Sequence, residues 1–159
     1  MDNINIKEQT TKNEGQRTND KGRILALDLG KKRVGVAVSD EMQMTTRGVS
    51  VITLSTQEKL FSAVQNLCAD FDAVALVIGL PLNLDGTESN GAIAARAIAA
   101  EITEQLSIPV FLQDERLTSR EAEENLREQG YDWREIKKLV DKEAAAIILR
   151  DFLAQHHRS

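Results

Sequence analysis

Three acidic residues occupy positions where an apolar residue or a simple turn would be expected. Asp28 lies near the end of the apolar segment "RILALDL", and Glu115 directly follows the segment "PVFLQD". Asp141 stands at the start of an apolar stripe in "LVDKEAAAIILRDFL". A carboxylate that leaves water without partners is costly, so it shifts its pKa or binds a metal ion. These residues are therefore candidates for acid chemistry.

Each of the three has a structural alternative when it is considered alone. Asp28, close to Gly30, can simply shape the turn that follows the strand. Asp114 and Glu115 can complement the dipole of the next helix. Asp141 can serve as an ordinary N-cap. The individual motifs leave these alternatives open.

The three acids together indicate a functional site more strongly than any one of them does, because all three map to one edge of the predicted sheet. Open α/β sheets bind ligands at the carboxyl ends of their strands. Carboxylates gathered there repel one another unless a cation or a proton intervenes. Mg²⁺ or Mn²⁺ suits an all-oxygen site, and two such ions can activate water and stabilise the leaving oxygen of a phosphodiester. The only histidines, His156 and His157, are adjacent near the C-terminus, which disfavours zinc and a Ser-His-Asp triad.

Basic and polar residues flank these acids along the chain. The turn "GKKR" and the residue after Glu115 supply cations that can contact phosphates. The loop "GLPLNLDGTESN" supplies polar side chains for a phosphate or a sugar, although its turn residues also suit an ordinary strand-to-helix loop. Thr118 has capping-box spacing to Glu121 and so predicts a helix start. It is also a candidate contact to the nucleic acid. The candidate nucleic-acid-binding residues are Lys31, Lys32, Arg33, Asn83, Asp85, Thr87, Arg116 and Thr118.

The elements that must position these side chains form an α/β pattern. Strands are predicted over 23–29, 34–39, 48–53, 73–79 and 109–113. Helices are predicted over 57–70 and 90–106, from 118 to Gly130, from Asp132 as a short helix, and over 140–155. Three early strands followed by βα alternation predict a mixed sheet with helices on both faces.

Composition places the chain among globular proteins of one domain. Its 159 residues are 42% hydrophobic and 28% charged, and the net charge of −5 argues against broad, non-specific nucleic-acid binding. No apolar run is long enough for a membrane span, so no membrane partner is expected. Cys68 in an apolar helical pattern indicates a buried, reduced thiol and a cytoplasmic protein. We expect a disordered tail over 1–22, one domain over 23–155 and a short tail over 156–159.

Four motifs in order, "LDLGKKRVGVAVSD", "GLPLNLDGT", "DERLTS" and "VDKEAAAIIL", resemble the YqgF-type family. This family is described as pre-16S rRNA nucleases and as Holliday junction resolvases. The resemblance implies an RNase H-like fold and a divalent-metal-binding catalytic set of Asp28, Glu115 and Asp141. It also implies cytoplasmic 5′-end processing of pre-16S rRNA, with structured RNA in the pre-ribosomal particle as partner. In one departure, Ser89 follows Glu88 where the family often has glycine.

Other functions fit the sequence less well. Resolution of branched DNA needs two symmetric active sites, normally in a stable dimer. No predicted helix offers an exposed apolar face for such a dimer, so a monomer or weak dimer is expected. The presence of the three acids disfavours a non-catalytic rRNA-binding assembly factor, because such a protein would be free to lose them. An actin-like or sugar-kinase ATPase would need a second phosphate-binding turn and a much longer chain.

Overall fold

The computed structural model describes residues 21–53, 55–115 and 118–156; the side chains of 118–122, 138 and 140–142 lie outside this description. Most of the predicted N-terminal tail and residues 157–159 of the predicted C-terminal tail also lie outside the described residues. The predicted tails therefore stay predictions.

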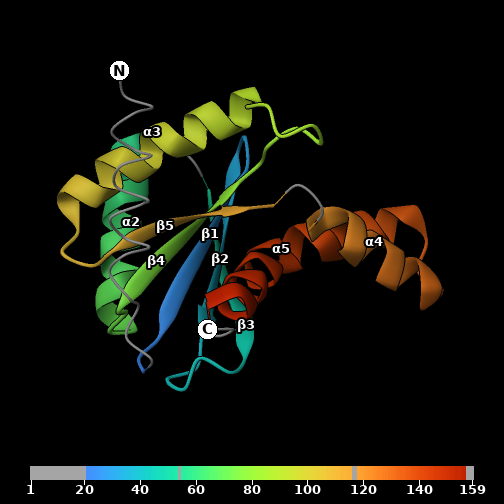
Figure 1. The fold of residues 1–159 in the computed structure, drawn as a ribbon, viewed down its shortest axis with the longest axis horizontal. Helices are drawn as coiled ribbons and strands as arrows, with labels where there is room; N and C mark the ends of the chain where they lie inside the picture. The colour runs from blue at the N-terminus through green and yellow to red at the C-terminus, as the bar shows by residue number, and fades with distance from the viewer. Residues whose placement is uncertain (1–20, 54, 116–117, 157–159) are drawn as a thin grey trace.

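A five-stranded mixed sheet forms the centre of the molecule, with the strand order β3-β2-β1-β4-β5 (Figure 1). The strands β1 (Ile24–Leu29), β2 (Arg33–Ser39) and β3 (Thr46–Thr53) form an antiparallel meander. The strands β4 (Ala75–Leu80) and β5 (Val110–Asp114) run parallel to β1. Three antiparallel strands followed by βα units confirm the predicted α/β fold class.

Helices cover both faces of this sheet, as predicted. The helices α2 (Gln57–Asp70) and α3 (Asn90–Gln105) lie on one face, and α5 (Trp133–His156) crosses the other (Figure 1). The helix α4 (Thr118–Glu128) packs against α5. No helix in the described part of the chain is long and apolar enough to cross a membrane.

Side-chain alternation in β1 divides the core between the two faces. Leu25 and Leu27 pack in the cluster with α2 and α3, whereas Ile24 and Ala26 pack in the cluster with α5. Asp28 continues the second series, so its strand position faces the α5 side of the sheet. Cys68 is buried in the first cluster, and this burial raises the pKa of its thiol to about 11. The thiol is thus a structural residue, as expected.

The C-terminal helices differ from the prediction. A short helix followed by a second helix over 140–155 was expected, but α5 is continuous from Trp133 to His156. The Asp132 carboxylate accepts a hydrogen bond of 2.9 Å from the Glu135 amide and caps the start of this helix. No glycine or proline interrupts the chain after that point. The predicted helix start near Val140 was therefore wrong, and α4 and α5 are separated only by the turn at Gly130, whose φ is +92°.

Leu149 is fully buried on the α5 side of the core. Its truncation should therefore lower the stability of the protein strongly. We expect Leu149→Ala to lower the free energy of unfolding by about 2–5 kcal/mol, because it removes apolar contacts and leaves a cavity. Leu84→Ala is the matched control, since Leu84 is 66% exposed and its truncation should change stability by less than about 0.5 kcal/mol. Urea unfolding measures both values, and equal effects would contradict this description of the core.

Candidate active site at the carboxyl edge of the sheet

The candidate site lies where three neighbouring parallel strands end. Leu27 in β1 pairs with Ile78 in β4, and Leu80 in β4 pairs with Asp114 in β5. Asp28, Gly79 and Glu115 follow these pairs at the same edge of the sheet. The strand order thus brings together residues that are distant in the sequence.

Gly79 makes room for the Glu115 side chain. A Cβ atom at position 79 would overlap the Glu115 carboxylate and would lie only 2.7 Å from Ile148 Cδ1. The Glu115 amide also donates a hydrogen bond of 3.2 Å to the Leu80 carbonyl, which fixes the backbone at the end of β4. The Glu115 carboxyl therefore lies directly over β4, under α5. This role of Gly79 was not predicted, although a glycine inside the apolar strand "ALVIGL" is a signal for close approach.

The electrostatics of Glu115 show that it lies near Asp28. Burial, followed by the negative charges of Asp28 and Asp114, raises the pKa of Glu115 to about 8. Asp28 and Glu115 therefore interact electrostatically across the sheet edge, and their catalytic and metal-binding roles stay predictions. Two carboxylates in a partly dehydrated site require a shared proton or a cation.

Asp141, the third predicted acid, lies in α5 directly before the part of the helix that packs on the sheet. The predicted stripe that follows it is buried, and consists of Ala144, Ala145, Ile148, Leu149 and Phe152. The Asp141 side chain lies outside the described residues. Among the described side chains, no three acids, histidines or cysteines form a group that could hold a metal ion. The meeting of all three acids therefore stays a prediction.

The predicted basic turn lies beside Asp28, because it connects β1 to β2. Gly30 is required there, since its amide donates a 2.9 Å hydrogen bond to the Arg33 carbonyl and a Cβ would lie 2.7 Å from that oxygen. Lys31, Lys32 and Arg33 are exposed. The turn presents its cations to solvent at the same edge as the acids.

The loop after β4 is ordered by its own polar side chains. Asp85 accepts hydrogen bonds from the Thr87 amide at 2.9 Å and the Thr87 hydroxyl at 2.6 Å, and the Asn83 amide group donates to that hydroxyl at 3.0 Å. Ser89, at the departure from the family pattern, caps α3 by accepting from the Ala92 amide at 3.0 Å. The structural alternative explains these contacts, and a substrate role for the loop stays a prediction. Arg116 and the Thr118 side chain lie outside the described residues.

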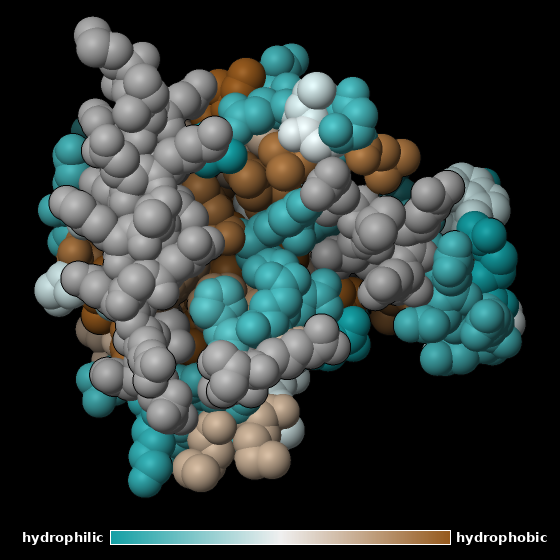
Figure 2. Space-filling model, in the orientation of Figure 1, coloured by the Kyte–Doolittle hydropathy of each residue, from teal (hydrophilic) through white to brown (hydrophobic). Residues whose placement is uncertain are grey.

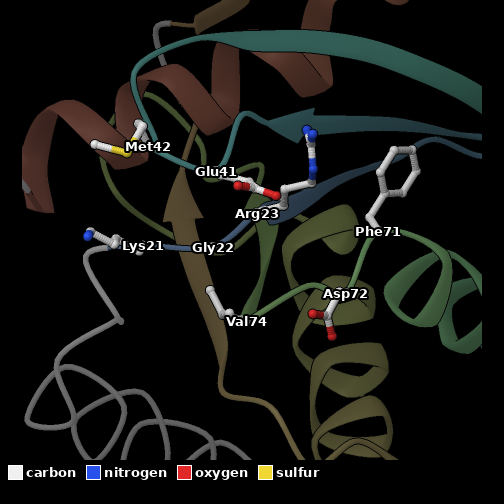
Figure 3. Close-up of a pocket in the computed structure, with 8 residues that line it drawn as sticks. All are labelled: Lys21, Gly22, Arg23, Glu41, Met42, Phe71, Asp72 and Val74. Atoms are coloured by element: carbon white, nitrogen blue, oxygen red, sulfur yellow. The ribbon is translucent and has the colours of Figure 1, made fainter.

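A separate pocket of about 160 Å³ lies at the opposite edge of the sheet, where β1 begins (Figure 3). It is lined by Lys21, Gly22, Arg23, Glu41, Met42, Phe71, Asp72 and Val74. The figure shows Val74 next to Gly22, and the charged side chains spread around the rim rather than meeting at one point. Asp28 lies near the other end of β1, so this pocket is not part of the acid site.

The strand order, the helices on both faces and the paired acids at the carboxyl edge define an RNase H-like α/β protein. A family model described as "RuvX: Holliday junction resolvase" matches residues 22–155. The chain therefore belongs to the RuvX family, also called YqgF, as its motifs predicted.

Relatives and a solved structure agree with this assignment. The chain is 43% identical to a protein of Anaeromyxobacter sp. (strain Fw109-5) named "Putative pre-16S rRNA nuclease", over 85% of this chain and 98% of the relative. It is 42% identical to a Syntrophomonas wolfei protein of the same name, over 82% and 93% of the two chains. The Thermus thermophilus RuvC structure in complex with a Holliday junction substrate superposes with a TM-score of 0.52. That match has 16% identity and covers 85% of this chain and 96% of RuvC, so it confirms the fold.

The raised pKa of Glu115 predicts a specific pH dependence of stability in metal-free protein. The unfolded chain ionises Glu115 near its ordinary value of 4.5, whereas the folded protein retains the proton until about pH 8. The contribution of the Glu115 carboxyl to the free energy of unfolding is therefore complete below pH 4.5 and is lost as the pH rises through 8. Glu115→Gln cannot titrate, so its free energy of unfolding relative to that of wild type should rise by roughly 4 kcal/mol between pH 5 and pH 9.

Urea unfolding in the presence of a chelator measures this difference. Glu123→Gln is the matched control, because Glu123 is exposed on α4. The free energy of unfolding of this variant should change with pH as that of wild type does. Parallel pH profiles for Glu115→Gln and wild type would show that the Glu115 carboxyl is not held as described.

Proposed function

We propose that the protein is a metal-dependent nuclease, a hydrolase that cleaves phosphodiester bonds at the 5′ end of pre-16S rRNA during ribosome biogenesis. The observation that supports it most directly is the Glu115 carboxyl, placed over Gly79 within electrostatic reach of Asp28. The name shared by the similar relatives supports the rRNA substrate. The proposal includes cytoplasmic location and structured RNA in a pre-ribosomal particle as the partner.

The donors at this site fit a hard divalent cation. Asp28 and Glu115 offer carboxylate oxygens, which Mg²⁺ and Mn²⁺ prefer. The two charges oppose each other's ionisation, so a cation is what would allow both to be ionised at neutral pH. Asp28 and Glu115 would hold one or two ions, with Asp141 as the third ligand. Bound there, the metal supplies Lewis acidity and an activated water.

Residues around the acids would bind the substrate and position the acidic side chains. Lys31, Lys32 and Arg33 would bind substrate phosphates beside the site, since they are exposed at the end of β1. Asn83, Asp85 and Thr87, together with Arg116 and Thr118, are proposed as further contacts to the nucleic acid. Gly79 leaves the space over β4 that the Glu115 carboxyl occupies, and Ile148 borders the same space.

Cleavage of branched DNA is the second candidate, because the matching family model is described as a Holliday junction resolvase. Two coordinated cuts require two active sites with a symmetric relation, which a single copy does not supply. We propose a monomer or weak dimer, and sedimentation with and without a four-way junction distinguishes the candidates. A stable dimer that cuts junctions and spares structured RNA would replace the first proposal with the second.

Asp28→Asn should reduce Mn²⁺-dependent cleavage of a pre-16S rRNA fragment by roughly 100-fold or more. It removes one of the two paired charges, and even outer partners of metal ligands cost about 10- to 100-fold when mutated. Asp72→Asn is the matched control, because Asp72 is exposed at the opposite edge of the sheet. Equal cleavage rates for Asp28→Asn and wild type would refute the assignment of Asp28.

Gly79→Ala should abolish most activity by displacing the Glu115 carboxyl, and should also destabilise the protein by about 1–3 kcal/mol through contact with Ile148. Adding Ile148→Val removes the Cδ1 atom in that contact and should restore much of the stability without restoring cleavage. Gly91→Ala is the control, since its nearest contact would be 3.2 Å from Pro81 Cγ. Thermal unfolding and cleavage rates are both measured, and recovery of activity in the double variant would contradict the role given to Gly79.

A further inference from the structure

We propose that Trp133, supported by Arg134, is a stacking platform for an unpaired base of the nucleic-acid substrate, a few nucleotides from the cleaved bond. The proposal rests on the nuclease function above and adds a substrate property to it, namely a single-stranded segment beside the cleavage position.

The first observation is the exposure of the aromatic ring. Trp133 is 70% exposed at the start of α5, and Tyr131 in the preceding turn is 40% exposed. The Arg134 guanidinium carbon lies 5.1 Å from the centroid of the Trp133 ring, a cation–π contact that restricts the ring while leaving much of its surface in solvent. A positioned, solvent-exposed indole is suited to stacking on a nucleobase.

The second observation is where this end of α5 lies. The α4 helix and the N-terminal half of α5 extend beyond the sheet as a helical hairpin (Figure 1). In the view of Figure 2 the end of this hairpin forms a largely hydrophilic lobe set apart from the body of the protein. The hairpin begins at Thr118, three residues after Glu115, and α5 leads back to the sheet. It therefore extends from the edge that carries the candidate acids.

The helical repeat of α5 determines which side of the hairpin is directed to that edge. Positions 134, 145, 148 and 152 are separated by eleven, three and four residues, so they share one side of the helix. Ala145, Ile148 and Phe152 from this series are buried against the sheet. Ile136, on the opposite side of the helix, is also buried, and α4 packs against α5. Arg134 thus lies on the continuation of the sheet-facing side, beyond the edge of the sheet.

The rise of the helix gives an approximate spacing. Position 133 precedes position 141 by eight residues, or about 12 Å at 1.5 Å per residue. A nucleic-acid strand advances about 3.4 Å per stacked nucleotide, so the platform corresponds to roughly three or four nucleotides from the candidate metal site.

The charges around the platform favour recognition of a base over recognition of phosphates. The described side chains of the hairpin include three exposed cations, Arg127, Arg134 and Lys137. They also include exposed acids, namely Glu123, Glu124, Glu128, Asp132 and Glu135. Such a balanced surface gains little from counterion release. Stacking on an aromatic side chain needs no excess of positive charge, and it tolerates any base sequence.

Binding to two RNA duplexes tests the platform, one fully paired and one with a single-stranded extension across the cleavage position. Trp133→Ala should weaken binding of the extended RNA by about 5- to 100-fold and leave the paired RNA unchanged. Trp133→Phe should stay within about threefold of wild type, because it retains an aromatic face. The control is Met44→Ala, since Met44 is 80% exposed in the turn between β2 and β3 at the opposite edge.

A fluorescent base analogue locates the contact along the strand. With 2-aminopurine at successive positions of the extension, wild type should quench the analogue most strongly about three or four nucleotides from the cleaved bond. Trp133→Ala should lose this quenching, and the salt dependence of its affinity should remain that of wild type, since no phosphate contact is removed.

Three results would overturn the platform: unchanged affinity of Trp133→Ala for the extended RNA, equal weakening for both RNAs, or a change in its sedimentation that indicates a protein contact instead. Cleavage of the same RNA by wild type and Asp28→Asn is measured in parallel. If wild type cleaves and Trp133→Ala binds normally, the platform alone fails. If wild type does not cleave more than Asp28→Asn but quenching occurs, the nuclease proposal fails and the stacking contact stands.

Discussion

The approach of two carboxyl groups, Asp28 and Glu115, is the constraint on which the arrangement of this protein depends. The charges oppose each other in a site where burial has removed part of the solvent. Such a pair is maintained only if the surrounding structure fixes it firmly. The parallel strands β1, β4 and β5 provide that support, because β4 lies between the other two and is buried along its whole length. It pairs with β1 as far as Ile78 and with β5 as far as Leu80.

The helix α5 connects this constraint to the rest of the molecule. Its apolar side fixes its rotation over the sheet through Ile148, Leu149 and Phe152. A helix fixed in rotation at one end has a fixed orientation along its whole length, so the packing over the sheet also orients positions 141 and 134 beyond it. Substitutions at Leu149 or Phe152 would therefore reach the candidate site through the orientation of α5, whereas Ile148 lies directly at Gly79.

Sequence patterns were sufficient for most of the fold, because the strands and helices here have strong periodicity. The proximity of Asp28 and Glu115 followed from their strand-end positions, since parallel neighbours must end at the same edge. The helix start at Asp132 was predicted correctly. Only the break before a separate final helix was wrong, because the acid at position 141 resembled a second helix start. The glycine in β4 signals a close approach, but the groups that approach Gly79 were not predictable, since Glu115 follows another strand and Ile148 belongs to α5. Contacts of that kind arise only when separate elements are packed together.

The net charge of −5 has a consequence for how a polyanion would be bound. A protein of this charge repels a nucleic acid at long range, so attraction must come from local features that act at short distance. The turn at Lys31, Lys32 and Arg33 is one such feature, and divalent cations between the acids would reverse the sign of the local field. Aromatic stacking is a further short-range term that does not depend on net charge. An acidic nuclease with these features would discriminate by the shape and pairing of its substrate, because it lacks the diffuse positive surface that retains any phosphate backbone.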